Sequence, residues 1–327
     1  MMTLLRWIGG RTTGPIGRWV VVTIGAMIII TGVKMAFSVP IGDQQIGSPL
    51  LWQNAHYNVS ARNINKWFAG ANQLVIYVEG QEENILKEPR VLAAMEDLRR
   101  YLLAQPEAGG TRDLATLVKS LNRPWHYNDP RWQVLPPDRI TAANLLFVYE
   151  AGAPNSQAIF EYTDRLGKDG QFVVFYKDTK GDSIREAIAR ARKFIAEHPI
   201  DGVRFRLAGG VVGIMAALNE EIAASEKQAT LLVILTVYML VWASYGSFVA
   251  ANMVMVALIA AGVASYMYIV LAGVGMNINS LPVTAVGMGI GVDYILYVVD
   301  RIRREVPSRT VRSCRESSER WLRLVWQ

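Results

Sequence analysis

Residues 281–299, LPVTAVGMGIGVDYILYVV, are the stretch that decides the fold of this chain. Nearly every position is apolar or small, and 19 residues of α-helix, at about 1.5 Å each, reach roughly 28 Å. This length is about the thickness of a bilayer's hydrocarbon core, so the stretch predicts a transmembrane helix. It holds one acid, Asp293, which Tyr294 follows directly. A carboxylate at this depth costs about 2.5 kcal/mol or more, so an acid inside a span usually has a function.

Three other segments have the same apolar character: residues 20–33, 229–244 and 249–271. The first has the basic flank and apolar core of a signal peptide, but no A-x-A-like cleavage site follows it. We therefore expect a retained transmembrane helix rather than a cleaved leader. The chain then has four predicted spans, and the short loop 245–247 makes the second and third antiparallel neighbours.

Arginines flank the outer ends of the four spans: Arg6, Arg11 and Arg18 come before the first, and Arg301, Arg303 and Arg304 come after the fourth. The positive-inside rule makes these ends cytoplasmic. Four spans also put both ends on one side, in agreement with the charges. Residues 1–19 read as an amphipathic lead-in, with Trp19 at the membrane interface. The residues between the first and second spans, 39–227, are therefore expected to be extracytoplasmic.

Residues 39–227 have an ordinary soluble composition, with strand-like and helix-like stretches in alternation. Apolar, β-branched runs predict buried strands at three places: 73–78, 172–176 and 203–207. Apolar spacing predicts a helix over 89–103, and another is expected over 182–198, with Asp182 or Ser183 as its N-cap. Residues 122–139, with four prolines and two tryptophans, predict a loop or a surface that faces a partner. This order of elements favours a compact α+β domain.

The predicted fold is a membrane α-helical bundle of four spans with an α+β extracytoplasmic domain. The expected parts are a lead-in and first span over 1–38, the domain over 39–227, three spans over 228–306, and a tail over 307–327. The tail, with five arginines and four serines, is either a cytoplasmic amphipathic segment or non-native sequence. A helical pattern without proline runs from Val211 to Trp242, so one continuous helix is expected to couple the domain to the membrane. Three polar residues of this coupling helix form a solvated face rather than a substrate site: Asn219, Glu220 and Glu221.

The distribution of charge argues against nucleic-acid binding. Of the net charge of +6, residues 1–38 contribute +4, residues 39–227 contribute −1 (22 bases, 23 acids) and residues 228–327 contribute +3 (eight bases, five acids). The excess lies beside apolar segments rather than on one folded face, which favours a membrane topology. Cys314 is the only cysteine, and the three histidines are too far apart in sequence for a standard metal site. The sequence has no nucleophile elbow or phosphate loop, so neither an enzyme nor a cofactor is expected.

Three glycines precede the acid of the fourth span: Gly287, Gly289 and Gly291. Gly287 and Gly291 share a helix face, and such pairs let a neighbouring helix approach closely. Asp293 and Tyr297, four residues apart, also share a face. Asp293 is either a buried acid held by hydrogen bonds or a proton or cation site, and Tyr294 and Tyr297 are either packing residues or relay groups. A G-x-G-x-G string is also typical of dinucleotide loops, but no strand precedes this one.

Three stretches resemble one known family. GMGIGVDYILYVVDRIRRE (287–305) is similar to the fourth span of a repeat in the resistance–nodulation–division (RND) superfamily, in its MMPL-type exporter branch. GGVVGIMAALNEEI (209–222) resembles the helix that joins the porter domain of this family to the second span. IGDQQIGSPLLW (41–52) resembles the C-terminal repeat more than the N-terminal one. The resemblance covers about residues 15–306 and makes the expected α+β domain porter-like.

The resemblance implies export of lipids or other hydrophobic compounds, driven by the proton motive force, in a bacterial inner (cytoplasmic) membrane. It places Asp293 and Tyr294 on the proton-relay positions of the family and the large domain on the periplasmic side. Such transporters have two repeats, so with four spans and one domain we expect either half of a split transporter or a truncated product. The implied partners are protons, membrane lipid, a hydrophobic substrate, and a second transporter half or another copy of the chain. The alternative from a different class is a membrane-anchored module that binds a lipid or a protein without transport.

Overall fold

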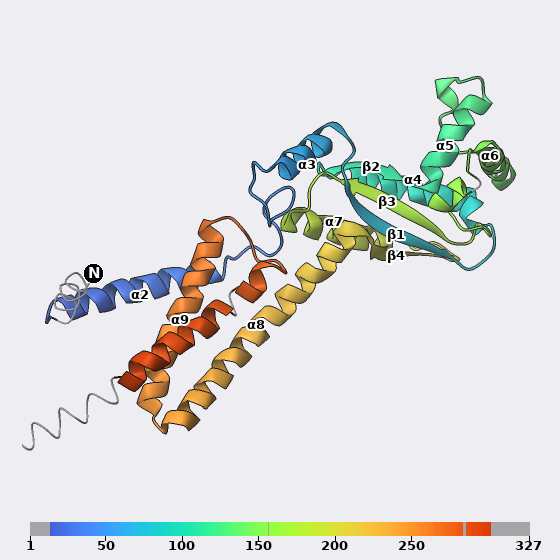
Figure 1. Ribbon diagram of the computed structural model, residues 1–327. Helices are drawn as coiled ribbons and strands as arrows, with labels where there is room; N and C mark the ends of the chain where they lie inside the picture. Colours follow the sequence, from blue (N-terminus) through green and yellow to red (C-terminus); the bar gives the residue numbers. More distant parts are fainter. Residues whose placement is uncertain (1–13, 156, 284–285, 302–327) are drawn as a thin grey trace, which may run out of the picture. The chain divides into compact units, whose positions relative to one another are not determined.

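The structure, a computed structural model, describes residues 14–155, 157–283 and 286–301 (Figure 1). The chain divides into two compact units. One consists of residues 41–221, and the other of the residues up to Pro40 and from Ile222 onward. The predicted tail, 307–327, and residues 1–13 of the predicted lead-in lie outside the described residues.

A four-stranded antiparallel sheet is the centre of the unit 41–221, with the strands in the order β2-β3-β1-β4. The strands are β1 (Asn72–Gly80), β2 (Ala108–Arg112), β3 (Gly170–Tyr176) and β4 (Val203–Gly209). Alternation along β1 turns Leu74, Ile76 and Val78 into the core, where all three are fully buried. The three predicted strands are confirmed as β1, β3 and β4. The sequence of β2, AGGTR, shows no apolar alternation and did not predict a strand.

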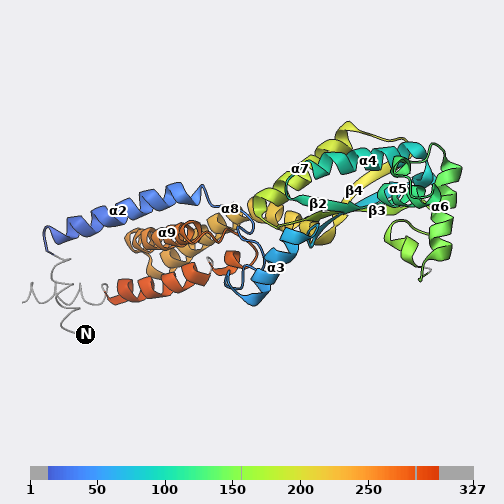
Figure 2. The same cartoon turned by 90° about the horizontal axis from the view of Figure 1, so that it is seen from above.

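Helices cover this sheet and extend beyond it (Figure 2). α4 (Pro89–Leu103) and α7 (Gly181–Glu197) pack side by side and share the core with the strands. α5 (Leu114–Trp125) packs on α4, and α6 (Arg139–Gly152) packs on α5. α3 (His56–Trp67) precedes β1. The short 3-10 helices are η1 (Ile85–Lys87), η2 (Pro130–Trp132) and η3 (Ala158–Glu161).

Two local predictions for this unit need correction. The N-cap residue of α7 is Lys180 rather than Asp182 or Ser183, and no side chain caps the helix. Asp182 instead lies in the first turn, where a negative charge is favourable, and pairs with Arg185 at 3.0 Å. Residues 122–139 are also more regular than a loop, because α5 continues to Trp125 with Pro124 in its last turn.

The other unit is helical. Its helices are α2 (Gly17–Ala36), the part of α8 (Gly210–Tyr245) from Ile222 onward, α9 (Phe248–Leu271) and a fourth helix over Ser280–Arg301. Each of the four is long and apolar enough to cross a membrane. The expected continuous helix from Val211 to Trp242 is confirmed, because α8 is unbroken over 36 residues. At about 1.5 Å per residue this helix is longer than a bilayer core requires.

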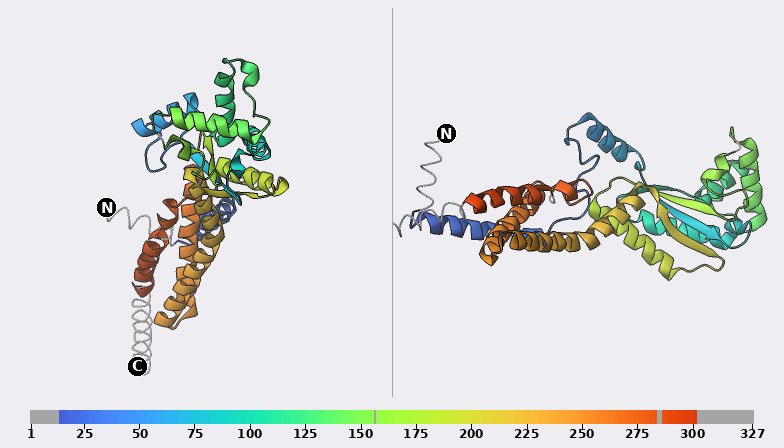
Figure 3. Two further views of the ribbon diagram at one scale, coloured as in Figure 1. Left: turned by 90° about the vertical axis from the view of Figure 1, so that its right-hand side faces the viewer. Right: turned by 60° about the horizontal axis from the view of Figure 1, so that its bottom comes forward.

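α9 is the helix against which α2 and the fourth helix pack. α2 contacts it at Gly32, where an added Cβ atom would overlap the side chain of Val263. The missing side chain thus allows a close approach of the two helices. The fourth helix, drawn in red, runs beside α9 (Figure 3). Side chains of α8, α9 and the fourth helix form two apolar clusters, around Val241, Ala251, Val254 and Val299 and around Met255, Leu258 and Met288.

Candidate functional site

The helix that carries Asp293 begins at a polar cap. Asn277 is buried, and its Oδ1 accepts hydrogen bonds from the backbone N–H groups of Asn279 and Ser280, both at 2.9 Å. The Oγ of Ser280 in turn accepts a bond from the N–H of Asn277 at 2.8 Å. These bonds satisfy amide groups that a helix start otherwise leaves unpaired. The loop before the helix therefore fixes the residue at which it begins.

The glycines of this helix do not all face the same way. A Cβ atom added to Gly287 would lie 4.0 Å from Ser265 Oγ, and one added to Gly291 would lie 3.8 Å from Ala261 Cβ. Both distances are ordinary contacts with α9, so these two glycines lie against that helix. A Cβ added to Gly289 would have no described atom within 4 Å. Gly289 is four residues before Asp293 and therefore lies on the same side of the helix as the acid.

Asp293, Tyr294 and Tyr297 lie on the exposed part of the fourth helix. Tyr294 is 71 % exposed and Tyr297 is 76 % exposed, and Asp293 is exposed as well. Among the described residues, no side chain forms a hydrogen bond or an ion pair with Asp293. The structure thus gathers the acid and both tyrosines on one helix, where the described residues leave them uncovered.

Two of the three polar residues predicted on the coupling helix have contacts within the unit 41–221. Glu220 forms an ion pair with Arg192 of α7 at 2.9 Å, and both side chains are more than half exposed. The side chain of Asn219 lies so close to Gly42 that a Cβ atom there would meet its Nδ2 at 2.7 Å. Gly42 also has a φ of +90°, a conformation that favours glycine. These contacts hold α7 and the loop near Gly42 to the start of α8, and Glu221 is exposed.

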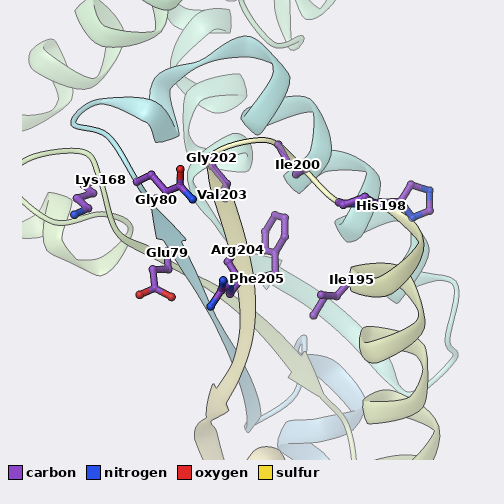
Figure 4. Close-up of a pocket in the computed structure, with 12 residues that line it drawn as sticks. Glu79, Gly80, Lys168, Ile195, His198, Ile200, Gly202, Val203, Arg204 and Phe205 are labelled. Atoms are coloured by element: carbon purple, nitrogen blue, oxygen red, sulfur yellow. The ribbon is translucent and has the colours of Figure 1, made fainter.

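A pocket of about 590 Å³ opens at one end of the sheet, between β1, β4 and the end of α7 (Figure 4). Figure 4 shows Glu79 and Lys168 on one side of β4, and Ile195 and His198 on the other. The ring of His198 stacks on Phe194 with centroids 4.3 Å apart, and its Nδ1 lies 3.1 Å from the Phe194 carbonyl oxygen. The lining thus mixes charged and apolar groups, which suits a polar headgroup better than a bare hydrocarbon chain.

Sequence reasoning did not find this pocket. Its lining residues come from three separate parts of the chain, around residues 79–81, at Lys168 and over 195–205. Apart from the glycines at the turns, no spacing or motif connects these parts before the sheet assembles them. In the described residues there is also no cluster of three or more His, Cys, Asp or Glu side chains that could hold a metal ion.

Comparison with known proteins bears on the part of the chain that includes β3, β4 and the last three apolar helices. No curated protein matches the chain. Residues 158–315 match a family model, described as the MMPL family. The resemblance to the MMPL-type branch of the RND superfamily is therefore confirmed over residues 158–315, which form an MMPL-family segment of this chain.

Proposed function

We propose that the chain is part of an RND-type transporter that exports lipids or other hydrophobic compounds and is driven by the proton motive force. The family match supports transport of hydrophobic compounds. The four apolar helices support a multi-pass membrane protein. In this proposal the membrane is the bacterial inner membrane and the sheet-containing unit is periplasmic, as the flanking arginines predict.

The observation that carries the proposal is the position of Asp293 on an uncovered part of an apolar helix. A charged carboxylate that faces lipid is costly, so intramembrane acids almost always face other helices or a water-filled cavity. Further helices, from a second transporter half or another copy of the chain, would cover this side. Asp293, Tyr294 and Tyr297 would then lie where the two sets of helices meet.

In this arrangement Asp293 takes up and releases the proton. The neutral acid is tolerated in an apolar interface, whereas the carboxylate requires a hydrogen-bond donor or a positive charge. Tyr294 and Tyr297 supply hydroxyl groups that can donate to it. Moving one charge through a potential of about 100 mV is worth about 2.3 kcal/mol, which is enough to bias a two-state bundle. α8 would carry the resulting movement toward the sheet-containing unit, because it is one unbroken helix.

The test measures proton uptake and lipid export in proteoliposomes that contain the chain and a complementing transporter half. Asp293→Asn should reduce both to background, because the amide cannot take up a proton. The matched control is Asp300→Asn, which removes an acid two helical turns further along the same helix, near the expected membrane surface. Undiminished export by Asp293→Asn would show that the proposed role is wrong.

A membrane-anchored binding module is the second candidate, and the mixed lining of the pocket beside β4 favours it. Such a module should bind its ligand equally well in Asp293→Asn and in the unchanged protein. Its affinity should fall when Arg204 of the pocket is replaced by Glu, because the charge of the lining is then reversed. Lipid-binding measurements on the purified full chain, with both variants, separate this candidate from the transporter.

A further inference from the structure

Helix α3 inverts part of the pattern of an ordinary surface helix, because two asparagines are buried and several apolar side chains are exposed beside polar ones. Its buried residues are Asn58 and Asn65. Tyr57 and Ile64, seven residues apart and so on one face, are 61 % and 48 % exposed. Phe68, which follows the helix directly, is also exposed. Since contiguous exposed apolar side chains mark an interaction surface, the inversion indicates that another apolar phase or molecule covers this helix.

Hydrogen bonds hold the helix in this orientation. The Nδ2 of Asn58 donates to three carbonyl oxygens of the loop 48–52 at 3.1–3.3 Å, and its Oδ1 accepts from the N–H of Ser48 at 2.8 Å. The Oδ1 of Asn65 accepts from the N–H of Ala71 at 2.9 Å. The buried side of α3 is thus bonded to neighbouring backbone at both ends. The same bonds hold the loop 48–52 beside the helix.

Six large apolar side chains of α3, of the residue after it and of the loop bonded to it are exposed, and we call them together the α3 face: Leu50, Trp52, Tyr57, Ile64, Trp67 and Phe68. Three of the six are tryptophan or tyrosine, the side chains that concentrate at membrane–water interfaces because one end is apolar and the other polar. Trp52 and Trp67 are among the most exposed, at 86 % and 75 %. The composition of the face is therefore that of an interfacial segment.

The stretch of sequence that carries the α3 face has charges of one sign. Residues 44–78 contain no acid, whereas Arg62 and Lys66 lie on α3 itself. The Nζ of Lys66 lies 5.1 Å from the centroid of the Trp67 ring, so a positive charge borders the apolar face. Basic residues beside an apolar helix face are the combination that binds anionic headgroups.

The chain also tethers this face to a candidate span. α2 ends at Ala36, and Leu50 follows 14 residues later. Even a fully extended chain of this length reaches at most about 50 Å. A segment anchored in this way meets the bilayer surface at a high effective concentration, so a modest affinity is sufficient.

We infer that the α3 face is a lipid-contacting surface that lies among the headgroups of the bilayer and prefers anionic lipids. The α3 face shares no residue with the proposed proton site at Asp293 or with the lining of the pocket beside β4. The inference of lipid contact therefore holds whether or not the protein is a transporter. The Trp and Tyr content, the absence of acids and the tether to α2 all favour lipid as the occupant. The surface of another protein is the competing occupant.

The experiment places a fluorophore on the α3 face of the full chain in proteoliposomes. Cys314→Ser removes the only cysteine, so a single new cysteine can carry an environment-sensitive label. Labels are attached at Ile64→Cys and, in a second variant, at Phe68→Cys. The matched control is Phe147→Cys on α6, an aromatic position of the same unit that is 70 % exposed. The quencher is a lipid with a spin label close to its headgroup, in vesicles with and without phosphatidylglycerol.

The expected result is blue-shifted emission that the spin-labelled lipid quenches about twofold or more at residues 64 and 68, with little quenching at 147. Quenching should increase when phosphatidylglycerol is present. Blue-shifted emission without quenching would show that a protein surface covers the face and would overturn the inference. Unshifted, unquenched labels, or equal quenching at 147, would overturn it as well. Circular dichroism of each labelled variant verifies that the fold is kept.

Discussion

Two carboxylates, one in each unit, have opposite surroundings. Glu96 of α4 is only 4 % exposed and forms ion pairs with three cations, Arg99 at 2.6 Å, Lys119 at 3.0 Å and Arg100 at 3.1 Å. Asp293 lies on an apolar helix and has no such partner among the described residues. A buried charge is stable only when it is paired and hydrogen-bonded. The sheet-containing unit thus pairs Glu96 with cations of its own, whereas Asp293 of the helical unit has no partner among the described residues.

The largest effect on stability is expected from Glu96→Gln. The neutral amide leaves Arg99 and Lys119, both mostly buried, without a counter-charge. We expect a loss of about 2–3 kcal/mol in the free energy of unfolding, below the 3–5 kcal/mol of a fully buried pair because the cations keep some contact with water. Chemical unfolding of the purified chain, followed by circular dichroism, measures it. The control, Asp182→Asn, breaks an exposed pair of the same spacing and should cost less than about 0.5 kcal/mol.

The same acid should make the unit sensitive to low pH. Hydrogen bonds from Arg99, and then from Lys119, lower the pKa of Glu96 to about 2, against the opposing effect of burial. Because the folded pKa lies below the unfolded value of 4.5, the stabilisation is complete above pH about 4.5 and is lost as the pH falls toward about 2. The difference in unfolding free energy between the unchanged protein and Glu96→Gln should therefore shrink over this range. A difference that stays constant with pH would show that Glu96 does not act through its charge.

A smaller effect is expected at the glycines of the fourth helix, where one side contacts α9 and the other is uncovered. Gly291→Leu introduces a side chain that must displace Ala261, so we expect a loss of about 1–2 kcal/mol in the stability of the helical unit. Gly289→Leu should leave the stability of this chain unchanged, since a Cβ there meets no described atom. If another set of helices covers Asp293, Gly289→Leu should weaken that assembly instead. Thermal unfolding in detergent measures the first effect, and co-purification of the complementing half measures the second.

The sequence predicted the elements whose apolar residues form a long run or recur at a regular spacing. The four spans follow from bilayer thickness, and β1, β3 and β4 follow from runs of apolar, β-branched residues. The helix α3 could not be found in this way, because Tyr57 and Ile64 are exposed whereas Asn58 and Asn65 are buried. The strand β2 was equally hidden, since two of its five residues are glycine and its pairing comes from β3, which is distant in sequence.

The candidate site was only partly visible in the sequence. Periodicity placed Gly287 and Gly291 on one side of the fourth helix, and the structure brings both to α9. The same periodicity puts Gly289 on the opposite side, but it could not show which side of the helix a neighbour covers, because that depends on how the helices pack. The pairing of Glu96 with Lys119 was hidden for the same reason. Lys119 is 23 residues away and reaches the carboxylate only after α5 packs on α4.

The smallest effect on stability is expected at Asp293. Asp293→Asn should change the unfolding free energy of this chain by less than about 0.5 kcal/mol, because the carboxylate has no partner among the described residues that the amide would lose. The same substitution should abolish proton-driven export in the reconstituted transporter, so stability and activity would separate at this residue. Glu96→Gln should show the reverse order, with a large loss of stability. A loss of more than about 1 kcal/mol for Asp293→Asn in the chain alone would mean that the acid is already paired within it, and that its uncovered position is not a reason to expect further helices.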